Sequence, residues 1–151
     1  MAALTKDRNT PEAMGDMRSG GVAAATTIYA GAIVMRNASG YLRNGATATA
    51  LVGVGRAEER VVNSGSAGDE TVKYRAGVFR FGNSASGDLI AIADIGKVCF
   101  VVDDQTVAKT NGTGTRSPAG FVDHVDSLGV WVRFDEAMLQ SYLAGITEPA
   151  A

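Results

Sequence analysis

The chain has 151 residues, 46% of them hydrophobic and 20% charged, so it is long enough and apolar enough to bury the core of one domain. Its 14 basic and 16 acidic residues give a net charge of -2, without a basic run, which argues against a nucleic-acid-binding protein. No stretch approaches the ~20 apolar residues of a spanning helix and no signal peptide is visible, so we expect neither membrane insertion nor secretion.

Nineteen glycines predict many tight turns between short strands. Segments rich in Val, Ile and Phe, interrupted by Asp, Asn, Ser and Gly, are typical of sheets joined by such turns. We therefore predict a mainly β fold, a compact sandwich-like or barrel-like domain with an extended N-terminal arm and one short C-terminal helix. The predicted parts are an arm over residues 1–25, a β domain over 26–134, a helix over 135–145 and a tail over 146–151.

Residues 1–25 differ from the rest because they are mostly polar, mixed in charge and without a sustained period of 2 or 3.6. Residues 19–21, Ser-Gly-Gly, predict a flexible joint before the domain. Either the segment is disordered, or it is an arm that becomes ordered by adding to the sheet edge of a partner. The side chains expected to contact another subunit or a capsid from this segment are Leu4, Arg8, Met14 and Met17.

Residues 26–35 predict a first strand that is apolar on both faces, as in a strand covered on both sides. After a turn, residues 41–43 predict a short return strand, and residues 50–63 predict a second long strand. Within it, Gly53 and Gly55 lie two apart on one face, which indicates a close backbone crossing or a bulge. A nucleotide-binding loop is a poor alternative, because the third glycine of the dinucleotide motif is missing and no helix follows.

The clearest strand pattern covers residues 70–81, where apolar and polar side chains alternate until Gly77 and then slip by one. A slip of one residue flips the buried face, so we predict a bulge or a change of sheet near Gly77. Residues 89–96 predict a loop and short strand, and residues 97–108 predict a hairpin across a polar turn. Residues 111–117 are rich in Gly and Thr and predict an exposed, mobile loop.

Residues 130–134 predict a strand with an aliphatic core face and with Trp131 and Arg133 on the other face. Trp131 then belongs either to a second core face or to a contact with another subunit, where Trp and Arg are enriched. Asp135 is expected to cap a helix that ends at Gly145. Since three turns are not stable alone, the apolar stripe of this helix must pack on the domain or a neighbour. The stripe consists of Met138, Leu139, Tyr142 and Leu143.

Few residues suggest chemistry. His124, the one histidine, has carboxylates near it, but on a regular strand Asp123 points to the opposite face and Asp126 shares the face of His124, which makes a poor metal site. Residues 103–104, Asp-Asp, predict a polar turn, and Cys99 predicts a buried core residue. No nucleophile elbow, phosphate loop, HExxH or CxxC occurs. We therefore expect no catalytic residues, no metal, no cofactor and no enzymatic activity.

Short motifs follow one another between about Ala23 and Phe134. They are Gly31-Ala32-Ile33-Val34-Met35, Leu51-Val52-Gly53-Val54-Gly55, Ala76-Gly77-Val78-Phe79, Lys97 to Asp104, Ala119-Gly120-Phe121-Val122 and Gly129 to Phe134. In this order the chain resembles the head decoration, or capsid cement, proteins of tailed bacteriophages, of the Mu-like and siphophage type. The first 20 residues and the C-terminal helix are less well covered.

The resemblance implies a β domain that binds the outside of an icosahedral shell and reinforces it against the pressure of the packaged DNA. It implies the major capsid protein as partner, self-association as a homotrimer, and no catalysis or cofactor. It also implies a place on the capsid exterior of the virion, after synthesis in the host cytoplasm. No contact with nucleic acid or membrane is expected in this role.

Two other classes of protein stay open at this point. An adhesion or carbohydrate-binding β-sandwich of a phage particle would expose Tyr29, Tyr41, Tyr74 or Trp131 on one concave face. An enzyme would show a cleft converging on His124. A decoration protein would instead use those aromatic positions for flat, apolar contacts between subunits.

Overall fold

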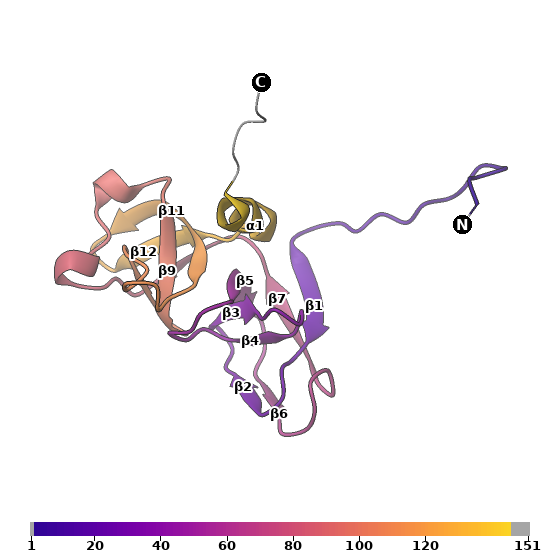
Figure 1. Cartoon of the computed structure of the whole chain (residues 1–151), viewed down its shortest axis with the longest axis horizontal. Helices are drawn as coiled ribbons and strands as arrows, with labels where there is room; N and C mark the ends of the chain where they lie inside the picture. The colour runs from indigo at the N-terminus through magenta and orange to yellow at the C-terminus, as the bar shows by residue number, and fades with distance from the viewer. Residues whose placement is uncertain (1, 146–151) are drawn as a thin grey trace.

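The computed structural model describes residues 2–145 as two five-stranded sheets, a two-stranded sheet and a short helix (Figure 1). The first sheet contains, in spatial order, β1 (Met17–Gly21), β7 (Thr71–Arg75), β5 (Val52–Ala57), β3 (Ile33–Arg36) and β4 (Leu42–Asn44). The second contains β10 (Thr106–Ala108), β9 (Val98–Asp103), β11 (Pro118–Asp126), β12 (Gly129–Arg133) and β8 (Val78–Phe81). The two-stranded sheet, called the ribbon below, contains β2 (Thr26–Ile28) and β6 (Val61–Asn63). This architecture confirms the predicted mainly β, sandwich-like fold.

Both five-stranded sheets curl until their outermost strands meet. In the first sheet, Val22 follows β1 and bridges Leu42 of β4, and the Ala23 amide donates to the Leu42 carbonyl at 2.8 Å. In the second sheet, Gly82 follows β8 and bridges Thr106 of β10. In each sheet a single bridge therefore joins the two outermost strands, as in a partly closed barrel. Fewer backbone groups are left unpaired than at the edges of an open sheet.

β3 lies between two hydrophobic cores. Its Ile33 and Met35 pack in a first core cluster with buried residues of the second sheet, whereas Val34 faces a second core cluster inside the first sheet. This confirms the prediction of a strand that is covered on both faces. Cys99 lies in the first core cluster, as predicted, and its burial raises the pKa of the thiol to about 12.

Gly53 allows the two large sheets to touch backbone to backbone. A Cβ atom at this position would lie 2.0 Å from the carbonyl oxygen of Ala119 in β11, so only glycine fits where β5 and β11 cross. At Gly55 a Cβ atom would lie 2.3 Å from the Arg75 carbonyl oxygen in β7. The register between β3 and β5 also shifts once. Both features predicted for this glycine pair, a close crossing and a bulge, are therefore present.

Two segments predicted as single strands are each divided between two sheets. Residues 26–35 form β2 and β3, separated by a turn in which Gly31 has a φ of +86°. Residues 50–63 contain β5 and β6, separated by a bend where the Glu58 amide donates to the Lys73 carbonyl at 2.9 Å. The single-strand predictions are wrong for two reasons. Nothing polar marks the turn at Gly31, and the charged residues 58–60 do not by themselves distinguish a bend from an exposed strand face.

The change of sheet predicted near Gly77 is confirmed, because β7 belongs to the first sheet and β8 to the second. The hairpin of β9 and β10 is also confirmed. Residues 89–96 lack the predicted short strand; they follow the 3-10 helix η1 (Ser86–Asp88) and contain the 3-10 helix η2 (Ile92–Asp94). The buried carboxylate of Asp94 accepts a hydrogen bond from the Ala91 amide at 2.8 Å, which closes the second of these turns.

The helix α1 (Glu136–Ala144) begins and ends where the sequence predicts. Asp135 accepts a hydrogen bond from the Met138 amide at 3.1 Å, and Gly145 has a left-handed φ of +62°. These two residues satisfy backbone groups at the two ends of the helix.

α1 packs on the body through one apolar side chain and one ion pair. Leu139 is completely buried. Glu136 forms a bidentate ion pair with Arg36 of β3, with oxygen–nitrogen distances of 2.6 and 3.2 Å. The other members of the predicted stripe are about half exposed: Met138, Tyr142 and Leu143.

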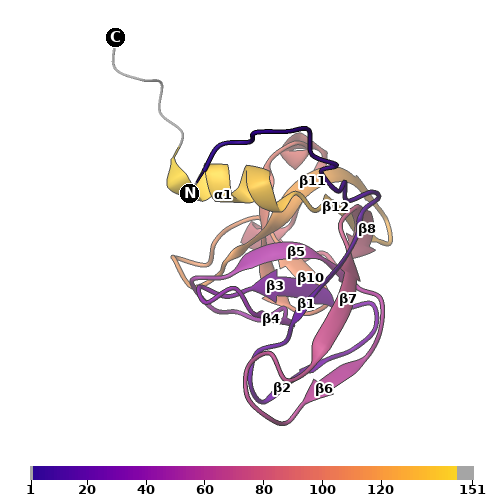
Figure 2. The same cartoon turned by 90° about the vertical axis from the view of Figure 1, so that its right-hand side faces the viewer.

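The arm is shorter than predicted, because its last part forms the strand β1. Residues 17–21 were expected to belong to an arm ending at residue 25, but each of them pairs with a residue of β7, and Val22 is completely buried. The absence of a side chain at Gly20 leaves room for Leu42 of β4, because a Cβ atom there would lie 2.8 Å from Leu42 Cδ1. The free arm is therefore residues 2–16 (Figures 1 and 2). The predicted tail, residues 146–151, lies outside the described residues.

Candidate interaction surfaces

The N-terminal arm extends away from the body and is exposed along its described length (Figures 1 and 2). Three predicted contact residues lie on it: Leu4, Arg8 and Met14. The side chains of Leu4 and Met14 are 74% and 80% exposed, so the body leaves them uncovered. Met17, the fourth contact residue predicted in this region, starts β1 and is 39% exposed.

The direction in which the arm leaves the body is fixed at Asp16. Its Oδ1 atom lies 2.7 Å from Nη1 of Arg75, and its carbonyl oxygen accepts a hydrogen bond from the Ala76 amide at 3.1 Å. Arg18 Nη1 donates to the Gly15 carbonyl at 2.9 Å. The Asp16–Arg75 ion pair is partly exposed and contributes at most about 1 kcal/mol, but the three contacts together orient the root of the arm.

Trp131 stands in a row of three side chains on the outer face of the second sheet. The strand register places His124 on one side of it and Arg80 on the other. The His124 and Trp131 rings stack with their centroids 5.0 Å apart, and Arg80 Cζ lies 5.7 Å from the indole centroid. The indole Nε1 donates to Asp126 Oδ2 at 2.8 Å; this hydrogen bond, followed by that of the Leu128 amide, holds the pKa of Asp126 below its usual range.

The alternation predicted for this strand is confirmed. Val130 and Val132 are completely buried, whereas Trp131 is half-buried and Arg133 is exposed on the opposite face. Trp131 belongs to neither core cluster, which removes the alternative of a second core face. The structure therefore brings Trp131 and Arg133 together on one surface but does not place them on the arm that carries Leu4.

A bulge in β11 changes the arrangement predicted around His124. The register against β12 shifts between Val122 and His124, and Asp123 Oδ2 lies 2.8 Å from His124 Nδ1. The prediction that Asp123 points away from His124 is therefore wrong, because it assumed a regular strand, whereas Asp126 lies on the face of His124 as predicted, where both contact Trp131. Asp123 also lies 3.7 Å from Arg133 Nη2. Within residues 2–145, no group of three His, Cys, Asp or Glu residues is placed to hold a metal ion.

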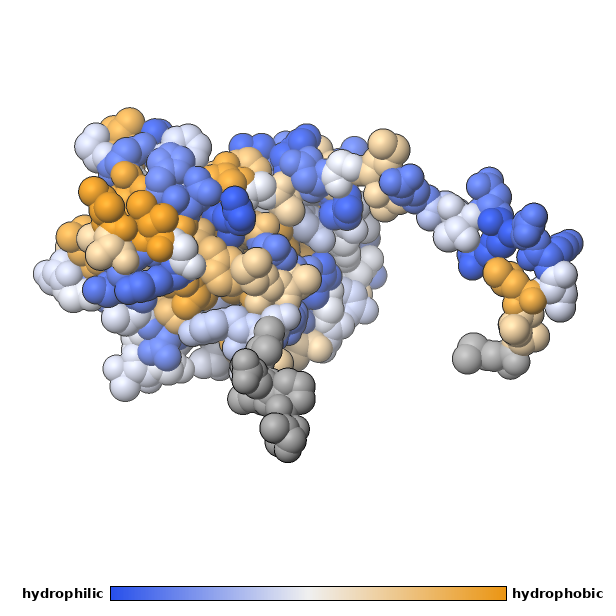
Figure 3. Space-filling model, turned by 90° about the horizontal axis from the view of Figure 1, so that it is seen from above, coloured by the Kyte–Doolittle hydropathy of each residue, from blue (hydrophilic) through white to orange (hydrophobic). Residues whose placement is uncertain are grey.

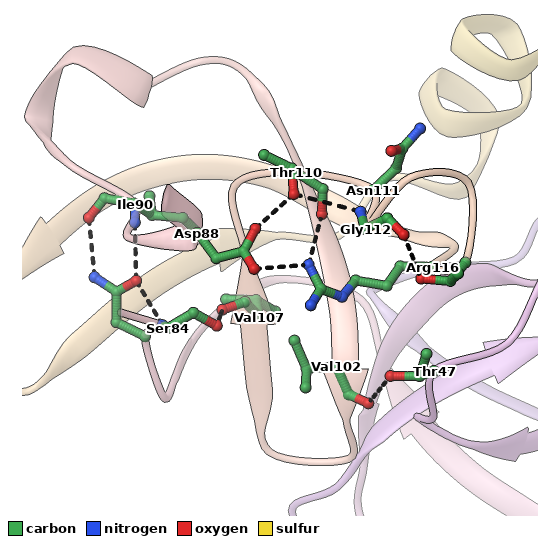
Figure 4. A network of polar contacts seen from close by, with 12 residues as sticks. Thr47, Ser84, Asp88, Ile90, Val102, Val107, Thr110, Asn111, Gly112 and Arg116 are labelled. Atoms are coloured by element: carbon green, nitrogen blue, oxygen red, sulfur yellow. Dashed lines mark hydrogen bonds and ion pairs between the residues drawn. The ribbon is translucent and has the colours of Figure 1, made fainter. Parts of the chain in front are cut away.

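The glycine-rich loop over residues 111–117 is fastened at its base by Asp88 (Figure 4). Thr110 Oγ1 donates to Asp88 Oδ1 at 2.5 Å, while Arg116 Nη1 lies 3.2 Å from Asp88 Oδ2 and donates to the Thr110 carbonyl at 3.1 Å. The Thr110 hydrogen bond, followed by that of Arg116, holds the pKa of Asp88 below its usual range. The loop predicted to be mobile is exposed, but these contacts tie both of its ends to η1.

The tip of this loop is a left-handed turn. Gly112, Thr113 and Gly114 have φ angles of +62°, +58° and +79°, and the amides of the next two residues both donate to the Asn111 carbonyl at 3.0 Å. A positive φ is uncommon for a β-branched residue such as Thr113. The loop therefore has a defined, hydrogen-bonded backbone conformation.

The aromatic side chains named above do not gather on one face. Tyr74 is buried in the second core cluster, and Tyr29 is 54% exposed next to the ribbon, with Arg60 Cζ 5.2 Å from its ring centroid. Trp131 lies on the second sheet, with its ring between His124 and Arg80. These residues do not form the concave aromatic face expected of a carbohydrate-binding module.

A groove of about 550 Å³ runs between α1, the glycine-rich loop and the first sheet. Its charged lining residues are Arg36 and Arg116, and each is already paired with a carboxylate, Glu136 and Asp88 respectively. His124 is not among the residues that line this groove. Both arginines of the groove are therefore held in ion pairs, and the histidine that an acid–base site would need lies elsewhere.

Besides the half-exposed side chains of α1, exposed apolar side chains form two further groups on the body, and sequence reasoning identified neither. One group consists of Leu89, Ile92 and Ile95, which are 48%, 76% and 45% exposed. Figure 3 shows apolar side chains gathered at the end of the body away from the arm. The other group is Tyr29 and Val62 of the ribbon, which are 54% and 52% exposed. The exposure of both groups was not predicted, because the sequence of a short strand or loop does not show which of its side chains the rest of the fold will bury.

No family model matches the sequence, and the comparisons with curated proteins and with solved structures found no match either. Among the described residues, no helix has the length and hydropathy needed to cross a membrane.

Proposed function

We propose that this protein binds the outer surface of a bacteriophage capsid shell and stabilises the shell, as a decoration or cement protein. The observation that carries this proposal is the pairing of a body built on two cores with an exposed arm whose root is held at Asp16. The order of motifs between Ala23 and Phe134 supplies the partner, the major capsid protein, through its resemblance to decoration proteins.

In this proposal the arm is the clamp. Ordering a residue costs about 1–2 kcal/mol of backbone entropy, so the arm stays extended until a partner supplies contacts that exceed this cost. Leu4 and Met14 offer apolar side chains to bury, Arg8 offers a cation for surface carboxylates, and the unpaired backbone can add to a sheet edge. The arm and the glycine-rich loop together reach across junctions between capsomers, so rupture of the shell requires breaking their contacts.

A homotrimer on the shell would strengthen this binding. When several arms belong to one assembly, binding of the first raises the effective concentration of the others. The protein would be made in the host cytoplasm and function on the capsid exterior, without nucleic acid, membrane, cofactor or catalysis. The alternative of an adhesion or carbohydrate-binding module is not favoured, because the exposed aromatic residues lie on separate elements.

The test removes the arm and nothing else. A chain lacking residues 2–15 keeps Asp16 and β1, so it should unfold like the full chain and yet no longer co-sediment with empty shells. The double variant L4D/M14D should lose most shell binding, since both exposed apolar anchors become charged. The matched control is T5D/N9D, which places the same charges on polar positions of the arm and should bind far better. Undiminished co-sedimentation of the shortened chain would remove the arm from the proposal.

A further inference from the structure

We propose that Asn111 deamidates without an enzyme, by attack of the Gly112 amide nitrogen on its side chain, and that Thr110 and Asp88 take up the proton of that amide. The inference goes beyond shell binding, because it concerns a covalent change of the chain itself.

The sequence contains two Asn-Gly pairs, and the fold holds them differently. Such pairs close a five-membered imide ring readily, because glycine leaves the attacking nitrogen unhindered. Asn44 belongs to β4 and pairs with Val34, and the Gly45 amide donates to the Ile33 carbonyl at 2.8 Å. That nitrogen is held in the sheet, and its proton faces a carbonyl that passes it no further. Asn111 lies instead in the exposed glycine-rich loop.

The attacking nitrogen beside Asn111 has a proton acceptor with an onward path (Figure 4). The Gly112 amide donates to Thr110 Oγ1 at 3.3 Å, and the Thr110 hydroxyl donates to Asp88 Oδ1 at 2.5 Å. The amide proton can therefore pass to Thr110 while the hydroxyl proton passes to the Asp88 carboxylate. Arg116, 3.2 Å from the other carboxylate oxygen, keeps Asp88 in place. A positioned proton acceptor of this kind is what general base catalysis requires.

The side-chain carbonyl under attack has a hydrogen-bond donor aimed at it. The Gly114 amide donates to Asn111 Oδ1 at 3.2 Å, and negative charge develops on this oxygen when the nitrogen adds to Cγ. A backbone amide in this place stabilises such an oxyanion. In Figure 4 the side chain of Asn111 points away from Asp88, and the residue is exposed, so water reaches its amide group.

The reaction consumes one water molecule and releases ammonia. A bond forms between Gly112 N and Asn111 Cγ, and the proton of this nitrogen moves through Thr110 to Asp88 and then to water. The bond from Cγ to Nδ2 breaks as Nδ2 takes a proton from water and leaves as ammonia. Water then opens the imide at Cγ, which gives aspartate, or at the backbone carbonyl carbon, which gives isoaspartate.

The isoaspartate product changes the tip of the loop. It routes the main chain through Cβ and turns the former backbone carbonyl of residue 111 into a free carboxylate. In the unmodified loop that carbonyl accepts hydrogen bonds from the Thr115 and Arg116 amides, both at 3.0 Å. The loop therefore changes in both backbone path and charge as the protein ages.

The first experiment follows both Asn-Gly pairs in the purified, folded full chain by peptide mass spectrometry after incubation at neutral pH. The peptide with Asn111 should show the mass of the acid, while the peptide with Asn44 stays unmodified over the same period. In urea, where neither pair keeps its hydrogen bonds, the two peptides should react at similar rates. Folded-state rates that are equal at the two pairs, or faster at Asn44, would overturn the proposal.

Matched variants at the exposed Thr110 separate proton transfer from loop rigidity. Thr110→Val lacks the hydroxyl and should react about tenfold more slowly, which is less than the usual effect of a positioned acid or base because water competes at this exposed site. Thr110→Ser keeps the hydroxyl and should react at the wild-type rate. Asp88→Asn should also slow the reaction, although it removes the ion pair with Arg116 and so loosens the loop. An unchanged rate in Thr110→Val, or a faster reaction in Asp88→Asn, would contradict the proton path.

The pH profile is a readout that loop rigidity alone does not move. Without an internal acceptor the amide proton goes to hydroxide ion, so the rate falls steeply from pH 8 to pH 6. Asp88 stays ionised over this range, because its hydrogen bond from Thr110 and its contact with Arg116 hold its pKa below the usual range. The wild-type rate should therefore fall less steeply than the rates of Thr110→Val and Asp88→Asn, and equal slopes would overturn the role of Asp88. No shell takes part in these measurements, so this proposal and the proposed function fail separately.

Discussion

At the scale of single residues, this fold depends on positions where a side chain is absent or where one side chain holds several neighbours. Gly53 is the first kind, because the carbonyl of Ala119 occupies the space of a Cβ atom. Asp88 is the second kind, because it accepts from Thr110 and pairs with Arg116 at once. The sequence predicts a close crossing at Gly53 but not its partner Ala119, and it predicts no role for Asp88, since the partners come from distant segments.

Gly53→Ala should therefore destabilise the protein strongly. The added methyl group would meet backbone atoms at 2.0–2.8 Å, which cannot move aside as a side chain can. We expect a loss of about 3 kcal/mol in the free energy of unfolding, at the upper end for overpacked sites. Urea titration of Gly53→Ala beside Gly87→Ala checks this, because a Cβ atom at Gly87 meets nothing within 4 Å. Equal stability of the two variants would mean that β5 and β11 can separate at no cost.

Asp88→Asn should remove a pH-dependent part of the stability. The folded protein lowers the pKa of Asp88 below its reference value of 3.8, through the Thr110 hydrogen bond first and then Arg116. A carboxyl group with a lowered folded pKa stabilises the fold above its unfolded pKa and loses this contribution as the pH falls through the folded pKa. The difference in unfolding free energy between wild type and Asp88→Asn should thus be largest near neutral pH and shrink below about 3.8. A difference that stays constant from pH 7 to pH 2.5 would contradict this reading.

At the scale of elements, α1 shows how a short helix is kept in place. It has good caps at both ends, but a helix of nine residues is not stable without tertiary contacts. Its fixed contacts are the buried Leu139 and the ion pair of Glu136 with Arg36. The remaining apolar residues of its stripe stay half exposed, so Leu139 should account for most of the docking free energy.

Leu139→Ala should therefore cost about 2–5 kcal/mol, the range for truncating a buried leucine. Tyr142→Ala is the matched control on the same helix: its side chain is 48% exposed and should cost less than half as much. Far-ultraviolet circular dichroism and urea titration together would separate undocking of the helix from global unfolding. Similar losses for both variants would show that the exposed flank of α1 is covered in solution.

The elements that could be predicted from the sequence carry local signals. Asp135 and Gly145 mark the ends of α1, and the slip of period at Gly77 marks the change of sheet. Other features depend on partners that only the fold supplies. β1 was missed because its pairing uses backbone groups while its side chains stay mostly exposed, and the contact of Asp123 with His124 was missed because it requires a bulge.

At the scale of the whole molecule, the boundary between arm and body decides what can be removed. Residues 2–16 are exposed, but β1 forms the outer strand of the first sheet and leads to the buried Val22. β1 covers one side of β7, and Val22 closes the sheet against β4. The two segments are adjacent in sequence, but deletion of the arm should leave the free energy of unfolding unchanged, whereas deletion of β1 should lower it.

Two truncated chains test this boundary. Removal of residues 2–15 should leave the free energy of unfolding within about 0.5 kcal/mol of the full chain, the usual range for exposed sites. Removal of residues 2–22 should cost several times more, because burial of a valine stabilises by about 1.5–3 kcal/mol and the strand hydrogen bonds to β7 are lost as well. Fluorescence of Trp131, the one tryptophan, can follow both transitions in urea from the second sheet, away from the deletion. If both chains unfold at the same urea concentration, β1 belongs to the arm, and the body begins at residue 23.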